Sequence, residues 1–240
     1  MAFINANETK VLYGANALAA YLRSVTPNAT IEMLDVTSLN DSAKAYIPGL
    51  RDYTMSIEGL FDTTTGAGSV WDAITTPINN SSVVATSVGT AGFATGNQVW
   101  MLPARSITYD VSSSVSDVVG FSMSLGAGQP ATIGVSLRDL SAVTATGNGT
   151  SVDNSTSTSN GFVAHLHVTS VSGTTPSMTA IIQHSSNGST WTTLGSFTAI
   201  TASGTEIITG TGTVNRYIRA SYTISGTDPS FTTQISLGRL

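Results

Sequence analysis

The chain has 240 residues, which is enough for one large all-β domain or for two domains of about 100–150 residues. Only 10% of the residues are charged, against roughly 25% in a typical soluble domain, and Ser, Thr, Val and Gly are abundant instead. This composition favours strands and turns and excludes a helical bundle. Nine basic and fourteen acidic residues give a net charge of −5, which argues against tight binding of nucleic acid through its phosphates. The absence of cysteine excludes disulfides, thiolate metal sites and cysteine nucleophiles.

The start of the chain has no targeting pattern. The first thirty residues contain neither a basic start nor a continuous apolar run, and nothing approaches the roughly 18 apolar residues of a membrane-spanning helix. We therefore expect no membrane anchor.

Strand patterns dominate the first 145 residues. Residues 10–25 favour strand pieces joined by a turn over a helix, because Gly14 interrupts the helical spacing of the apolar residues. Apolar and polar residues alternate from Tyr53 to Phe61, which predicts a half-buried strand. One helical turn is expected at Ser42–Ala45, ended by Pro48-Gly49, and one helix at 67–76, ended by Pro77. Further strands are expected near 31–36, 83–88, 98–110 and 117–125.

The second part of the chain has a different pattern. Residues 145–160 contain almost no apolar side chain, which predicts a linker or a long exposed loop. Short strands punctuated by turn residues then follow, with turns expected at Ser172-Gly173 and Asp228-Pro229 among others, which is typical of a small antiparallel sandwich. Asn187-Gly188 is the strongest hairpin signal. The expected strands lie near 162–171, 178–185, 190–199, 205–210, 213–224 and 230–237.

No catalytic motif is recognisable. The sequence lacks a Gly-Lys-Ser/Thr phosphate loop, a Gly-x-Ser-x-Gly elbow and a His-Glu-x-x-His helix. His165 and His167 share one face of an expected strand, and with His184 on the next strand they could bind a transition metal. Because no carboxylate lies near them in the sequence, we interpret them as surface residues. We expect no catalytic, cofactor-binding or metal-binding residues.

Four acidic residues in one stretch could form a paired-carboxylate site, but their positions favour turn caps and a solvated strand face. They are Asp35, Asp41, Asp52 and Glu58.

Three side chains of the second part could bind a ligand. Trp191 could stack on a sugar ring, but an inward Trp that anchors the core of a sandwich is favoured. Tyr217 and Arg219 lie on the polar face of an expected strand, where solvated side chains are the default.

Residues 34–62 carry three short patterns in order. They are Asp35-Val36-Thr37 before a loop, Pro48-Gly49-Leu50-Arg51-Asp52 as a turn, and Glu58-Gly59-Leu60-Phe61-Asp62 at the end of a strand. This stretch resembles the major tail (tail tube) proteins of long-tailed bacteriophages. The run from Gln183 to Trp191 is similar to the extra domain of some tail proteins.

The resemblance implies an all-β fold with one short helix. A tail-tube β-sandwich or barrel domain would occupy residues 1–145, and a linker with a C-terminal antiparallel β-sandwich appendage would occupy residues 146–240. It also implies a structural virion protein that is not an enzyme and holds no cofactor. Its rings, expected to be hexameric, would stack into a tube that conducts DNA into the host.

The implied partners are further copies of the chain, other tail proteins such as the tape measure, terminator and baseplate proteins, and passing DNA without specific binding. The C-terminal unit could also contact a host-surface glycan. The implied location is the phage tail, assembled in the cytoplasm of the host bacterium.

Two stretches are expected to contribute to the tube, one to its assembly and one to its lumen. The loop over residues 37–47 carries Tyr46 and Ile47, whose apolar area has no obvious local core, so we expect an assembly element there. Alternation across 52–60 leaves Glu58 on a polar face that is free to line the lumen. The alternatives are a non-enzymatic carbohydrate-binding or adhesin-like β-sandwich protein that uses Trp191, Tyr217 and Arg219, and an enzyme with an unrecognised site.

Overall fold

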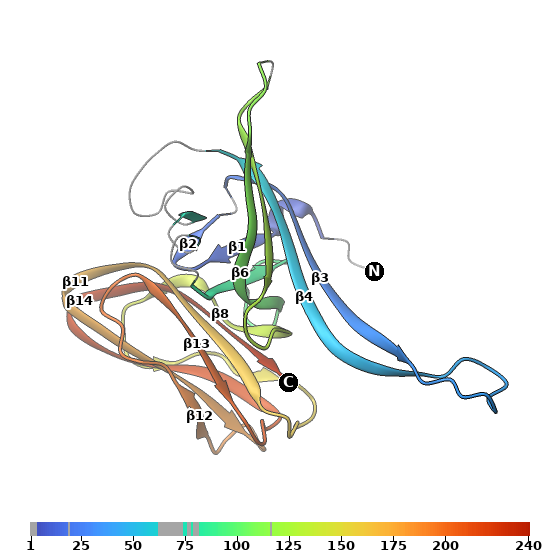
Figure 1. Cartoon of the computed structure of the whole chain (residues 1–240). Coiled ribbons are helices and arrows are strands. Elements are labelled where there is room, and N and C mark those ends of the chain that lie inside the picture. Colours follow the sequence, from blue (N-terminus) through green and yellow to red (C-terminus); the bar gives the residue numbers. More distant parts are fainter. Residues whose placement is uncertain (1–3, 19, 62–73, 76–77, 79–81, 116) are drawn as a thin grey trace.

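The computed structural model describes residues 4–18, 20–61, 74–75, 78, 82–115 and 117–240, and the regular elements in these ranges are almost all β-strands (Figure 1). The all-β fold class expected from the composition is confirmed. A 3-10 turn, η1 (Ala6–Glu8), is capped by the side chain of Asn5. Most of the helix expected over residues 67–76 lies outside the described residues; Ile74 and Thr75 are described and are helical. No helix in the described ranges is both long enough and apolar enough to cross a lipid bilayer.

The first unit forms strands at the positions that the residue pattern predicts, but the strand over residues 132–143 was not expected. The first two strands are joined by a turn at Gly14, whose positive φ of 60° suits a residue without a Cβ atom. The eight strands of this unit are β1 (Lys10–Tyr13), β2 (Asn16–Ala17), β3 (Leu22–Asp35), β4 (Tyr46–Leu60), β5 (Val84–Gly89), β6 (Gln98–Ser112), β7 (Gly120–Ala127) and β8 (Thr132–Val143).

The loop between β3 and β4 differs from the expectation. Ser42–Ala45 form no helical turn, because hydrogen bonds to the side chains of Asp35 and Asp41 hold the loop in a non-helical conformation. Pro48 and Gly49 end no element and form no turn; they lie inside β4. A proline without an N–H is tolerated at this position because β4 pairs there with β3 alone among the described strands.

Beyond residue 160 the second unit contains four strands where six were expected, and two of the four are much longer than expected. The strands expected at 162–171 and 178–185 are one strand, and so are those expected at 213–224 and 230–237. The turns expected at Gly173 and at Asp228-Pro229 are irregularities in a continuous pairing, with positive φ at Gly173 and Asp228. The six strands are β9 (Gly147–Asn148), β10 (Val152–Asp153), β11 (Phe162–Ser185), β12 (Thr192–Ser196), β13 (Gly204–Gly210) and β14 (Tyr217–Arg239).

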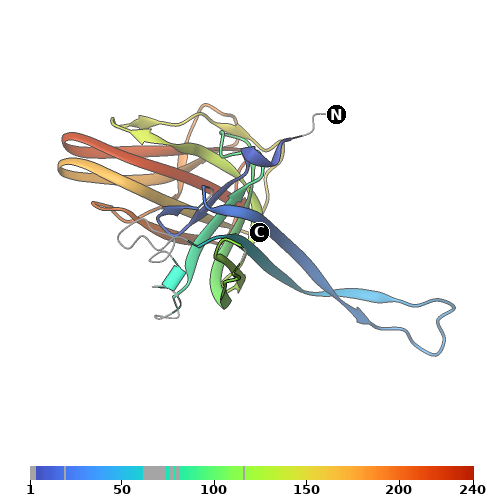
Figure 2. The ribbon, with the colours of Figure 1, turned by 90° about the horizontal axis from the view of Figure 1, so that it is seen from above.

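The strands β11 and β14 form one long antiparallel ribbon that folds back into two layers (Figures 1 and 2). One layer adds β13 and the other adds β12. Every residue from Phe162 to Val168 is buried, so the first layer is covered on both faces. The core between the layers includes Phe162, Leu166, Ala180, Ile182, Ile218 and Tyr222.

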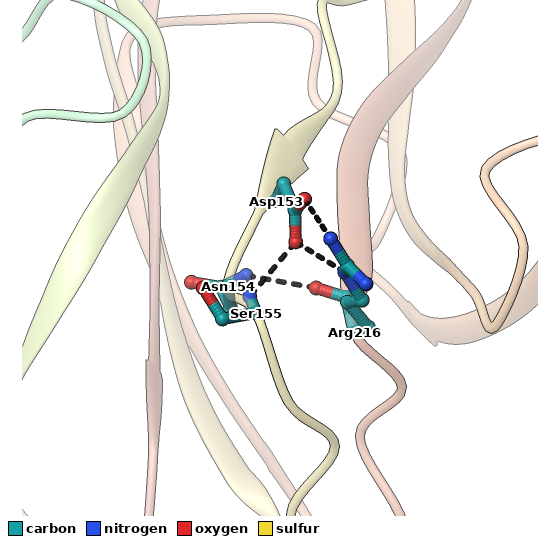
Figure 3. A network of polar contacts seen from close by, with 4 residues as sticks. All are labelled: Asp153, Asn154, Ser155 and Arg216. Carbon is teal, nitrogen blue, oxygen red and sulfur yellow. Dashed lines mark hydrogen bonds and ion pairs between the residues drawn. The ribbon is translucent and has the colours of Figure 1, made fainter.

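The two units share one sheet, since β8 pairs with β6 on one side and with β14 on the other. Residues 145–160 are mostly exposed, as expected, but they do not form a free linker. Both β9 and β10 pair with β14, and Asp153 forms an ion pair of 2.6 Å with Arg216 (Figure 3). This segment therefore lies along the second unit, while the domain boundary at residue 145 remains a prediction.

Candidate assembly surfaces

A four-stranded antiparallel sheet, in the order β3–β4–β7–β6, has two different faces. One face is apolar and packs on the core of the first unit, which buries Met55, Ile57, Met123 and Leu125. The opposite face is polar. The register aligns one row of Ser24, Glu58, Ser122 and Asp110, and the next row of Thr26, Ser56, Ser124 and Thr108. The alternation expected across residues 52–60 is confirmed, with Glu58 exposed on the polar face.

Both outer strands of this four-stranded sheet have an edge without a partner strand in the described chain. Among the described strands β3 pairs with β4 alone, and Pro27 within it is tolerated at such an edge. On the far side of β6, pairing with β5 stops at Ala104, so β7 is the one strand in the described part of the chain that pairs with residues 106–112. Unpaired edges offer N–H and C=O groups to another chain.

The arm, residues 30–52, is the part of the β3–β4 hairpin beyond the last residue pair of β4 with β7. It projects away from the body in both views (Figures 1 and 2). Tyr46 is 46% exposed and Ile47 is 49% exposed, so these side chains have no local core, as expected. An isolated hairpin is marginally stable in water, and clustered exposed apolar groups mark interaction sites. The other exposed apolar side chains of the arm are Ile31, Met33, Leu34, Val36, Leu39 and Leu50.

The four acidic residues do not form a paired-carboxylate site. Asp52 and Glu58 are six residues apart on β4, which corresponds to about 20 Å along an extended strand. Paired catalytic carboxylates need a separation of about 5–10 Å. Asp35 accepts a hydrogen bond from the backbone N–H of Thr37 at 2.9 Å, and Asp41 accepts one from Ser38 at 2.7 Å. The side chain of Thr37 and then its backbone N–H hold the pKa of Asp35 below its usual value, and the backbone N–H and then the side chain of Ser38 do the same for Asp41, as expected of turn caps.

His165 and His167 are fully buried between the two units, so their interpretation as surface residues is wrong. The Oγ of Ser87 on β5 lies 3.1 Å from Nδ1 of His165 and 2.9 Å from Nε2 of His167. Nδ1 of His167 lies 2.7 Å from the carbonyl oxygen of Gly14. Burial lowers the pKa of both imidazoles, to about 4 for His167.

The directions of these hydrogen bonds follow from the carbonyl of Gly14, which can only accept. Nδ1 of His167 must therefore donate to this carbonyl oxygen. Nε2 of His167, which then carries no proton, accepts a hydrogen bond from the hydroxyl of Ser87. The Oγ of Ser87 in turn accepts a hydrogen bond from Nδ1 of His165. Nε2 of His165 is then a buried acceptor, and it has no partner in the described chain. His184 is not part of this group, since its Nδ1 accepts from the backbone N–H of Asn215. The described residues contain no cluster of three His, Asp or Glu side chains that could hold a metal.

Trp191 does not anchor the core, so this expectation is wrong. Its side chain is partly exposed on the layer that contains β12, called the outer layer below, and the Cζ atom of Arg219 lies 4.2 Å from the ring centroid. Nε of Arg219 donates to Oε1 of Gln183 at 2.8 Å. Arg216 lies over the ring of Tyr217 in the same way, at 4.9 Å. The expected ligand-binding residues therefore lie on one layer, with an arginine over each aromatic ring.

Neither a scan against protein-family models nor a search of curated proteins finds a match. The solved structures that are similar include a protein of the virion of a native gene transfer agent particle, at 15% identity and a TM-score of 0.46 over 55% of this chain and 98% of that chain. The SPP1 tail tube protein is similar at 13% identity and a TM-score of 0.41, over 52% of this chain and 75% of that chain. The SPP1 Dit protein, part of a phage adsorption apparatus, is similar at 12% identity and a TM-score of 0.35 over 95% of this chain and 98% of that chain. The similar structures thus include a tail tube protein, which is the type of protein that residues 34–62 resemble.

Proposed function

We propose that this chain is a non-enzymatic structural subunit of a phage tail tube. Its copies form hexameric rings, and the rings stack into a conduit for DNA. The observation that carries the proposal is the four-stranded sheet with one core-packed face, one polar face and two unpaired edges. The resemblance of residues 34–62 to tail tube proteins supports it, and the number six rests on that resemblance alone.

Ring closure follows from the strand directions. In the order β3–β4–β7–β6 each strand is antiparallel to the next, so β3 and β6 run in opposite directions. Residues 106–112 of one copy can therefore pair antiparallel with β3 of a second copy in the same orientation. Such a contact joins two different surfaces, and repeating it by a rotation closes a ring. Closure also removes edges that would otherwise aggregate.

The polar face then lines the lumen of the ring. It presents hydroxyl side chains with Glu58 and Asp110, and neither carboxylate has a cation partner among the described residues. Six copies at −5 each carry −30 in total, which is the sign of DNA itself. A lumen that repels phosphates lets DNA pass without specific binding, as a conduit requires.

The proposal places the protein in the virion tail, assembled in the host cytoplasm beside tape measure, terminator and baseplate proteins. A carbohydrate-binding protein is the alternative. It would use the outer layer with Trp191, Tyr217 and Arg219, where Arg219 has N–H donors besides the one bound to Gln183.

Negative-stain images of the purified protein, or of the particle that contains it, test the proposal. We expect rings or tubes. The double variant Ile107→Lys with Val111→Lys puts two charges on the unpaired edge of β6, where both side chains are exposed, and should stay monomeric with unchanged circular dichroism. The matched control Thr223→Lys with Ser225→Lys, on exposed residues of β14, should assemble normally. Normal tubes from the edge variant, or a wild-type monomer that binds glycans, would overturn the proposal.

A further inference from the structure

Buried polar side chains form a row where the second unit packs on the first. The register puts His165 of β11 opposite Ser236 of β14, and Ser236 opposite Ser136 of β8, so these side chains project from one face of the sheet. Gln234 lies two residues before Ser236 on β14 and shares this face. All four side chains are fully buried. A polar group in such a place costs free energy unless it has a hydrogen-bond partner.

The orientation of the Gln234 amide follows from two backbone carbonyls. Oγ of Ser136 lies 2.7 Å from the carbonyl oxygen of Phe93 and 3.0 Å from that of Arg138. Both oxygens can only accept, so the one hydrogen of the Ser136 hydroxyl is used for them. The Gln234 atom that lies 3.4 Å from Oγ of Ser136 must therefore be the nitrogen, which donates. Oε1 of Gln234 is then a buried acceptor, and it has no partner in the described chain.

Two acceptors and one hydroxyl of this row lack a partner. Nε2 of His165 is an acceptor because of the hydrogen-bond directions set by Gly14, and Oε1 of Gln234 is the second acceptor. Oγ of Ser236, which lies opposite His165, also has no partner among the described residues. Since a hydroxyl has a single hydrogen, Ser236 can satisfy one of the two acceptors and not both.

A water molecule matches this set of groups. It has two hydrogens for the two acceptors, and its oxygen can accept from the hydroxyl of Ser236. Three hydrogen bonds are usual for a buried water. A metal cation does not match, because the row contains no carboxylate that could balance its charge.

We infer that one water molecule is bound between the two units, where it donates to Nε2 of His165 and to Oε1 of Gln234 and accepts from Ser236. It completes a chain of hydrogen bonds that begins at the carbonyl oxygen of Gly14 and ends at that of Phe93. Both ends belong to the first unit, whereas the three groups around the water belong to the second. The water therefore helps to fix how the two units dock, and this inference does not depend on the proposed function.

A crystal structure at a resolution that shows ordered water tests the site directly. We expect one water oxygen within about 2.7–3.2 Å of Nε2 of His165, Oε1 of Gln234 and Oγ of Ser236. A structure in which Ser236 donates directly to one of the two acceptors, with no water beside them, would overturn the inference.

Substitutions of Ser236 test the site in solution, with urea unfolding at neutral pH as the measurement. Ser236→Ala removes one hydrogen bond of the water but leaves its room, so the equilibrium constant for unfolding should rise by less than about tenfold. Ser236→Val fills that room with a methyl group, and both acceptors lose their donors. The constant should then rise about a hundredfold or more. Equal effects of the two substitutions would contradict the inference.

A second background separates lost hydrogen bonds from overpacking by valine. Gln234→Leu has a similar volume and removes one of the two acceptors. Ser236→Val should therefore raise the equilibrium constant about tenfold less in the Gln234→Leu background than in the wild type. An effect of Ser236→Val that is the same in both backgrounds would show overpacking alone and would also overturn the inference.

Discussion

At the scale of single residues, the buried histidine pair makes the fold sensitive to acid. A proton that enters the chain of His165, Ser87 and His167 leaves an N–H at Nε2 of His165, where the described structure offers no acceptor. The pKa of His167 is about 4 in the folded state and close to 6.5 in the unfolded state. Because the unfolded chain binds the proton more readily, the free energy of unfolding should fall as the pH drops from 6.5 to 4, by about 3 kcal/mol.

Urea unfolding at pH 7.5 and at pH 4.5 measures this loss. The variant His167→Gln should reduce the difference between the two pH values, whereas His184→Gln, at a less buried position, should leave it nearly unchanged. A pH dependence that is identical in the wild type and in His167→Gln would contradict the prediction.

At the scale of elements, the arm is a hairpin whose apolar residues have no core in their own chain. Tyr46→Ala with Ile47→Ser should change the free energy of unfolding by no more than about 0.5 kcal/mol, because both side chains are about half exposed. Tube formation should be lost, since burial of this apolar area against a second copy contributes about 25 cal/mol per Å². Sedimentation of tubes and thermal melting measure the two effects.

A control replaces exposed residues of β14, Thr223→Ala with Thr227→Ser, and should sediment as the wild type does. If the arm variant formed tubes of normal length, the arm would not be an assembly element.

At the scale of the whole molecule, we expect the first unit to depend on the second. Val163 of β11 packs in a cluster with Phe93, Val99 and Met101 of the first unit, and β14 covers the edge of β8. Residues 1–145 expressed alone should therefore expose an apolar surface and bind a hydrophobic dye much more strongly than the full chain. Co-expression of residues 146–240 should restore solubility. A soluble fragment 1–145 with a cooperative melting transition would show that the units fold independently.

The sequence alone determined the features that depend on neighbouring residues. Few charges and many Ser, Thr and Val residues predicted the all-β class, and the alternation around Met55 and Ile57 predicted which face of β4 is buried. The exposure of Tyr46 and Ile47 was predictable because nothing near them in the sequence could cover them. These features need only the two-residue period of a strand.

Tertiary structure decided the features that depend on contacts distant in the sequence. His165 is buried because β5, nearly eighty residues earlier, covers its face of β11. The consecutive apolar residues Phe162, Val163 and Ala164 were the signal for a strand covered on both faces. Gly173 bends a continuous ribbon instead of ending it, because pairing with β14 resumes beyond the irregularity. Trp191 is partly exposed, and the side chain that lies over its ring, Arg219, comes from a different strand. In each case a strand distant in the sequence determines the surroundings of the residue, and the pattern of neighbouring residues carries no information about that strand.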